Sequence, residues 1–170
     1  MTGTSRSRPP GNAAGWGGRQ WLYFPDDRYA EAVAIVRSAI DATGCTDVVI
    51  HGFSNGAAFA ASMYCHGESF DGRLRGVIVD DPVTDHGTES CNPAPGVEVA
   101  LYWTGGLDEE SKPGAACKPM DWTCQGDSLV GIEAYAASMG APVLASTNSS
   151  HAPMDEPPEI RTWLGLAVAG

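Results

Sequence analysis

Blocks of apolar residues with two different rhythms follow one another along the chain from about residue 20 onward. Continuous apolar runs of four to eight residues are typical of strands that are covered on both faces, and apolar residues recurring every three or four positions are typical of helices. The continuous runs predict strands at 20–24, 47–51, 73–80, 97–103 and 141–147. The periodic segments predict helices at 28–43, 55–65, 128–140 and 157–169.

This alternation of strands and helices indicates an α/β fold, in which a doubly wound, mostly parallel sheet carries helices on both faces. Ligands of such sheets lie beyond the carboxyl ends of the strands, so the loops after the strands are the places to look for chemistry. Residues 1–19 are rich in Gly, Pro, Ser and Arg and predict an irregular N-terminal arm. We therefore expect one domain, 20–170, behind that arm.

Composition narrows the possible functions. The 170 residues carry a net charge of −11 and only two lysines, which argues against a surface that binds nucleic acid. No apolar run approaches the roughly 18 residues that a membrane helix needs, and the first residues lack the apolar core of a secretory signal. These features favour a cytoplasmic protein, with secretion as the alternative if the true start lies upstream.

The five cysteines cannot all pair within the chain. Cys45 and Cys65 fall near the ends of apolar segments, which is typical of buried thiols. Cys91, Cys117 and Cys124 lie in stretches rich in Pro and Gly, where a Cys117–Cys124 disulfide is compatible with the spacing. Since no CxxC pair exists, we expect no zinc ribbon. The missing secretory signal favours mostly free thiols in a reducing compartment.

The strongest local motif is Gly52-Phe53-Ser54-Asn55-Gly56, which lies between a predicted strand and a predicted helix. A nucleophile on so tight a turn needs a strained backbone, and the residues two before and two after it nearly collide, which favours glycine at both places. The following helix directs its first amides toward Ser54. The amide of Asn55 is thus a candidate to stabilise an oxyanion.

A serine nucleophile needs a base to take its proton and a carboxylate to orient that base. Asp108 follows the predicted strand 97–103 by a few residues, and His151 follows the strand 141–147 in the same way. Ser54, Asp108 and His151 are therefore the predicted catalytic residues. Trp103, which precedes the loop with Asp108, is a weaker candidate for a wall of the acyl pocket.

With these residues in that order, the sequence resembles the α/β-hydrolase superfamily, and within it the carboxylesterase/phospholipase-like and dienelactone-hydrolase-like serine hydrolases. The resemblance covers about residues 20–168 and rests chiefly on GFSNG and the Ala-rich segment behind it. It implies hydrolysis of a small carboxylic ester or thioester through an acyl-enzyme on Ser54. No metal or organic cofactor is implied.

The sequence departs from that family at its beginning. The family fold has further strands before the segment that contains WLYF, and a loop after one of them supplies the second oxyanion amide. GNAAGWGG, at 11–18, is the candidate replacement for that loop. A shortened sheet would expose an edge at WLYF and favour a homodimer. The alternative function is a non-catalytic binding module on a degenerate hydrolase scaffold.

Several residues compete for the roles of acid and base. The alternatives to Asp108 as the acid are Asp80, Asp81 and Asp85, since some hydrolases place the acid after the earlier strand.

Among the other histidines, we expect His51 to be a hydrogen-bonded structural residue beside the Ser54 turn and His66 to interact with the end of a helix. His86 lies in a loop beside Asp85 without any recognisable zinc signature.

Overall fold

A computed structural model describes residues 5–15, 18–24, 26–84, 88, 90–104, 131–148 and 151–166 of the chain. Several residues singled out in the sequence lie outside the described residues: Asp85, His86, Asp108, Cys117 and Cys124. The roles predicted for these five residues therefore stay predictions.

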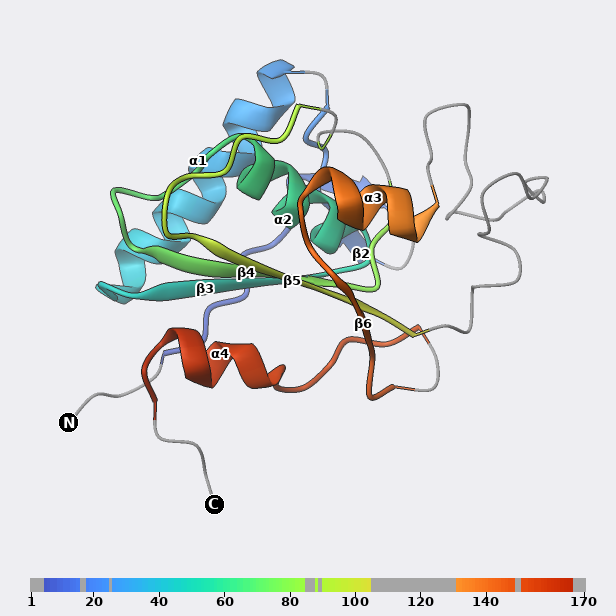
Figure 1. Cartoon of the computed structure of the whole chain (residues 1–170). Helices are drawn as coiled ribbons and strands as arrows, with labels where there is room; N and C mark the ends of the chain where they lie inside the picture. Colours follow the sequence, from blue (N-terminus) through green and yellow to red (C-terminus); the bar gives the residue numbers. More distant parts are fainter. Residues whose placement is uncertain are drawn as a thin grey trace.

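The described residues form a four-stranded parallel sheet in the order β3-β4-β5-β6. Its strands are β3 (Val48–Phe53), β4 (Leu74–Asp80), β5 (Glu98–Trp103) and β6 (Val143–Ala145). The helices are α1 (Asp26–Thr43), α2 (Asn55–Cys65), α3 (Ile132–Ser138) and α4 (Pro158–Trp163). Figure 1 shows α1, α2 and α3 on one side of the sheet and α4 on the other. The predicted α/β class, with helices on both faces, is confirmed.

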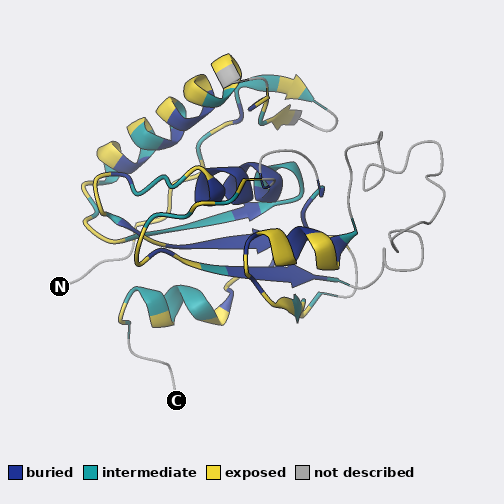
Figure 2. Cartoon of the chain, turned by 45° about the horizontal axis from the view of Figure 1, so that its top comes forward, coloured by how far each residue is buried: buried dark blue, intermediate teal, exposed yellow. Residues whose placement is uncertain are grey.

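The larger core lies between the sheet and the helices on the α1–α3 side. In α2 every residue from Ala57 to Cys65 is buried, and its small alanines allow it to approach the sheet closely. Figure 2 shows this helix buried against the sheet, with α1 exposing its outer face. The inner face of α1 is formed by Val33, Val36 and Ile40, at the helical spacing noted in the sequence.

A second, smaller core lies between the sheet and α4. It contains Ile78, Tyr102 and Met154, with Trp163 of α4 packed against them. The Trp163 ring lies so close to β4 that a Cβ at Gly76 would come within 2.2 Å of a ring carbon. Glycine at this position is what allows α4 to dock on the sheet.

The strand predicted at 20–24 is wrong, because residues 21–24 form no strand. Instead, β1 (Ala13–Gly15) and β2 (Gly18–Gln20) pair as a small antiparallel sheet within and just beyond the predicted arm. Trp21 and Tyr23 pack their rings on Phe59 of α2, at centroid distances of 4.8 and 5.4 Å. The alternating aromatic side chains thus serve helix packing and not a sheet ladder.

Residues 21–24 (WLYF) therefore cannot provide the exposed edge strand through which we predicted a dimer. In the described part of the chain, the edges of the larger sheet are β3 and β6. Dimer formation stays a prediction. As for membranes, no helix among the described residues is both long and apolar enough to cross a bilayer.

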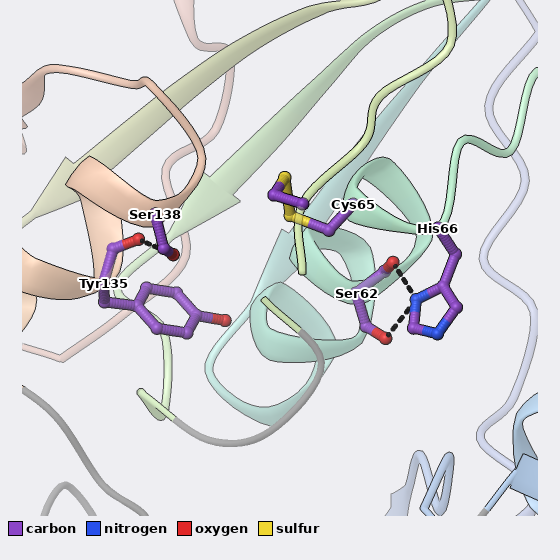
Figure 3. The surroundings of a disulfide bond; sticks show 6 residues. Ser62, Cys65, His66, Tyr135 and Ser138 are labelled. Carbon is purple, nitrogen blue, oxygen red and sulfur yellow. Dashed lines mark hydrogen bonds between the residues drawn. A yellow bond between two sulfur atoms is a disulfide. The ribbon is translucent and has the colours of Figure 1, made fainter. Parts of the chain in front are cut away.

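The prediction for Cys65 is also wrong, because it forms a disulfide with Cys91 (Figure 3). The bond joins the last residue of α2 to the segment before β5, where the Asn92 amide also donates to the carbonyl of Cys65 at 2.8 Å. Among the described cysteines only Cys45 is free. The local sequence does not reveal this pairing, because the two cysteines lie 26 positions apart along the chain.

His66 caps the same end of α2, and its Nδ1 lies 2.8 Å from the Ser62 carbonyl oxygen, as we expected for a histidine at a helix end.

We predict that the Cys65→Ser/Cys91→Ser double variant loses about 3 kcal/mol of unfolding free energy, because the disulfide closes a loop that the unfolded chain must otherwise close at an entropic cost. Urea denaturation with and without reductant measures this. The matched control is Cys45→Ser, which removes a free thiol and should leave the urea midpoint unchanged. A double variant as stable as the wild-type protein would contradict the prediction.

Candidate active site

The turn between β3 and α2 presents Ser54 in a strained conformation. Ser54 has φ 54° and ψ −122°, outside the regions that a serine ordinarily adopts. Its amide donates to the carbonyl of Asp80 at 3.0 Å, and its own carbonyl accepts from the amides of Ala57 and Ala58. The hydrogen bonds to β4 and α2 hold the turn in place.

The two glycines of the motif differ in how tightly they are confined. A Cβ at Gly52 would lie 2.2 Å from the Gly56 carbonyl oxygen, so no larger residue fits there without a backbone shift. A Cβ at Gly56 would meet only the Trp21 ring, at an ordinary contact distance of 3.7 Å. The steric constraint predicted for both positions therefore falls mainly on Gly52.

His151 lies between Ser54 and a buried carboxylate, that of Asp81. Its Nε2 is 3.1 Å from Ser54 Oγ, and its Nδ1 is 2.5 Å from Asp81 Oδ2. Because a carboxylate only accepts hydrogen bonds, Nδ1 carries the proton that is donated to Asp81, which leaves Nε2 of the neutral ring to accept from the serine hydroxyl. The three side chains form one continuous hydrogen-bonded chain.

Asp81 immediately follows β4 and is one of the carboxylates that the sequence leaves as alternatives to Asp108. It is fully buried and has φ 50°, a left-handed conformation that aspartate tolerates better than most residues. The Thr104 hydroxyl lies 3.2 and 3.3 Å from its two oxygens, and the Thr104 amide donates to it at 3.3 Å. Nothing in the sequence signals this threonine, because its partner comes from another strand end.

Phe53 is a further site residue that the sequence analysis missed. Its ring lies 4.6 Å from the imidazole of His151, centroid to centroid. Since the His151 side chain is one-third exposed, this packing limits the positions that the imidazole adopts.

The carboxylate next to Asp81 has different partners. Asp80 is also fully buried, and its Oδ2 accepts from His51 Nε2 at 2.9 Å and from the Met154 amide at 2.7 Å. Within the described residues, its Oδ1 has no hydrogen-bond partner. The expectation for His51, a hydrogen-bonded structural histidine beside the turn, agrees with this contact.

Tyr102 lies beside Asp80 in the register of β4 and β5, on the α4 side of the sheet. Its hydroxyl donates to the carboxylate of Glu159 on α4, at 2.7 and 2.6 Å to the two oxygens. Burial raises the pKa of Tyr102 above its ordinary value, and the bond and charge of Glu159 raise it further. The tyrosine is therefore committed to Glu159 as a neutral donor and does not bond Asp80.

The N-terminal segment folds against the start of α2. The Asn55 side chain accepts from the Trp21 amide at 2.7 Å and donates to the Trp21 carbonyl at 3.2 Å. Asn12 bonds Leu22 in the same two-way manner, at 2.6 and 2.7 Å. The amides of Trp21 and Leu22 are thus engaged, and neither is available as a second oxyanion donor. A donor within 11–18 stays a prediction.

Trp103 is 5% exposed and belongs to the larger hydrophobic core, which favours a packing role over a place in a pocket wall. Within the described residues, no three His, Cys, Asp or Glu side chains are arranged to hold a metal ion.

We predict that Gly52→Ala costs about 1–3 kcal/mol of unfolding free energy, because the added methyl group overlaps backbone that has to move. Gly56→Ala is the matched control within the same turn. It should be neutral or stabilise the protein by about 0.5–1 kcal/mol, since alanine is the better residue inside a helix. Urea denaturation compares the two, and equal losses would contradict the steric difference between them.

No protein-family model matches the sequence, and no curated protein matches it significantly. The structure is similar to the crystal structure of a carboxylesterase from Bacillus cereus, with a TM-score of 0.53 and 16% sequence identity over 86% of this chain and 67% of that one. At such low identity the likeness bears on the fold alone. The chain has an α/β fold similar to that of this carboxylesterase.

Proposed function

We propose that the protein is a serine hydrolase that cleaves small carboxylic esters or thioesters through an acyl-enzyme on Ser54. The observation that carries this proposal is the hydrogen-bonded chain Ser54–His151–Asp81, at 3.1 and 2.5 Å, at the carboxyl ends of the parallel strands. The strained turn at Ser54 and the esterase-like fold support it. A hydroxyl hydrogen-bonded to a base, with a carboxylate that orients the base, is what acyl transfer by an activated serine requires.

In the proposed mechanism, Ser54 Oγ attacks the substrate carbonyl while His151 Nε2 takes the hydroxyl proton. The tetrahedral oxyanion accepts a hydrogen bond from the Asn55 amide at the start of α2. His151 then gives its proton to the departing alcohol or thiol, leaving an acyl group on Ser54. Water attacks that ester with His151 again as base, which releases the carboxylic acid and restores the serine.

Asp81 takes the role that the sequence assigned to Asp108. Its carboxylate holds the Nδ1–H tautomer of His151 and stabilises the imidazolium that forms when His151 accepts the proton. Burial makes this interaction stronger than it would be in water, because little solvent competes with it. Thr104 in turn fixes the carboxylate.

We predict that a fluorophosphonate probe labels the folded wild-type protein once, by displacement of fluoride by Ser54 Oγ, and that Ser54→Ala takes no label. Intact-mass spectrometry measures the adduct. For short p-nitrophenyl esters, kcat of the variant should fall by on the order of 10⁶-fold. Folded wild-type protein that takes no label would overturn the proposal and favour the non-catalytic binding module.

A second pair of variants separates the two candidate acids. Asp81→Asn should lower kcat by on the order of 10⁴-fold, because the amide turned toward Nδ1 favours the tautomer in which Nε2 already carries a proton. Asp108→Asn, the matched control, should leave kcat close to the wild-type value. Steady-state hydrolysis of the same esters by both variants tests this, and the reverse pattern would return the role to Asp108.

A further inference from the structure

We propose that Asp80 is a positioning residue, which fixes the chain segment that carries His151 through the Met154 amide and is itself held by His51. This inference rests on the proposed function for its effect on catalysis. It concerns residues that take no part in the proton transfers described above.

The contacts of Asp80 reach both reacting side chains through the backbone. Its carbonyl accepts from the Ser54 amide at 3.0 Å, and its carboxylate accepts from the Met154 amide at 2.7 Å. Met154 lies three residues after His151, a distance that the chain spans in at most about 10 Å. A single residue therefore ties the nucleophile turn and the segment that carries the base to the same strand end.

The segment around His151 has few other anchors among the described residues. Asn148 donates from Nδ2 to the Ala152 carbonyl at 2.6 Å, which closes the chain around His151 from the other side. Met154 is buried in the smaller core, so its position depends on that packing and on the bond to Asp80. Removing the bond leaves the described contacts of Met154 with the apolar side chains of the smaller core.

His51 stabilises the buried carboxylate of Asp80 by donating a hydrogen bond to it. A buried carboxylate without donors is costly, and Asp80 lies next to a second buried carboxylate, Asp81. Tyr102, the neighbour on β5, donates to Glu159 instead. In the part of the chain that the structure describes, the Asp80 carboxylate therefore depends on two donors, His51 Nε2 and the Met154 amide, and both bind the same oxygen.

Three variants test the proposal. Asp80→Ala removes the acceptor and should lower kcat by about 10²-fold with KM unchanged, the effect of a misplaced base. Asp80→Asn keeps a carbonyl oxygen where Oδ2 lies and should retain most of the wild-type kcat. His51→Ala leaves the Met154 bond in place and should lower kcat less than Asp80→Ala does.

The matched control is Val77→Ala, which thins the larger core on the opposite face of the same strand. It should reduce stability in urea without changing kcat. The second readout is the far-downfield proton NMR signal of the His151 Nδ1–H on Asp81, assigned by its loss in His151→Gln. We expect the signal to broaden or vanish in Asp80→Ala, to persist in Asp80→Asn and to be unchanged in Val77→Ala.

A folded Asp80→Ala protein with wild-type kcat and an unchanged His151 signal would overturn the positioning role. If Asp80→Ala fails to fold, Asp80→Ser decides, because the shorter side chain also withdraws the acceptor from the Met154 amide. Wild-type values of both readouts in folded Asp80→Ser would overturn the role equally. Should the wild-type protein itself lack esterase activity, the proposed function fails. The NMR signal then still decides whether Asp80 positions His151.

Discussion

The arrangement of the site depends on the carboxyl end of β4, where two consecutive aspartates bind different parts of the chain. The Asp80 carbonyl and carboxylate bond the Ser54 amide and the Met154 amide, and the Asp81 carboxylate bonds His151. This strand lies between β3 and β5, and its ladder bonds on both sides hold it firmly. The end of a strand held in this way fixes the positions of the loops that are hydrogen-bonded to it. The left-handed backbone at Asp81 lets the two side chains take separate partners.

Burying two adjacent carboxylates is unfavourable unless each is hydrogen-bonded. The structure assigns one histidine to each, with His51 on Asp80 and His151 on Asp81. The two pairs are alike in composition but differ in access to solvent, since the His151 side chain is more exposed than that of His51. His151 also reaches a hydroxyl. One pair is thus suited to proton transfer and the other to holding the framework, and the difference comes from position alone.

The helix behind Ser54 is fastened at both of its ends by contacts that are distant in sequence. At its start, the Asn55 side chain bonds the backbone of Trp21, and at its end Cys65 is bonded to Cys91. Between these points its buried face lies on the sheet. A helix held in this way keeps its first amides at a constant place relative to Ser54, which is the preorganisation that stabilisation of an oxyanion needs.

Features that depend only on neighbouring residues can be read from the amino-acid sequence. Short-range periodicity predicts the helix 55–65 and the strands that correspond to β3, β4 and β5. The steric demand at Gly52 predicts the GFSNG turn, and both signals act within a few residues.

The folded chain determines which strand end supplies a carboxylate to His151. Asp81 and Asp108 both follow strands in the sequence, and only the spatial order of strands and loops distinguishes them. The folded chain also determines that Trp21 and Tyr23 pack on Phe59 and that Cys65 pairs with Cys91. These contacts join residues far apart along the chain, and local pattern carries no record of which distant residues meet once the chain is folded.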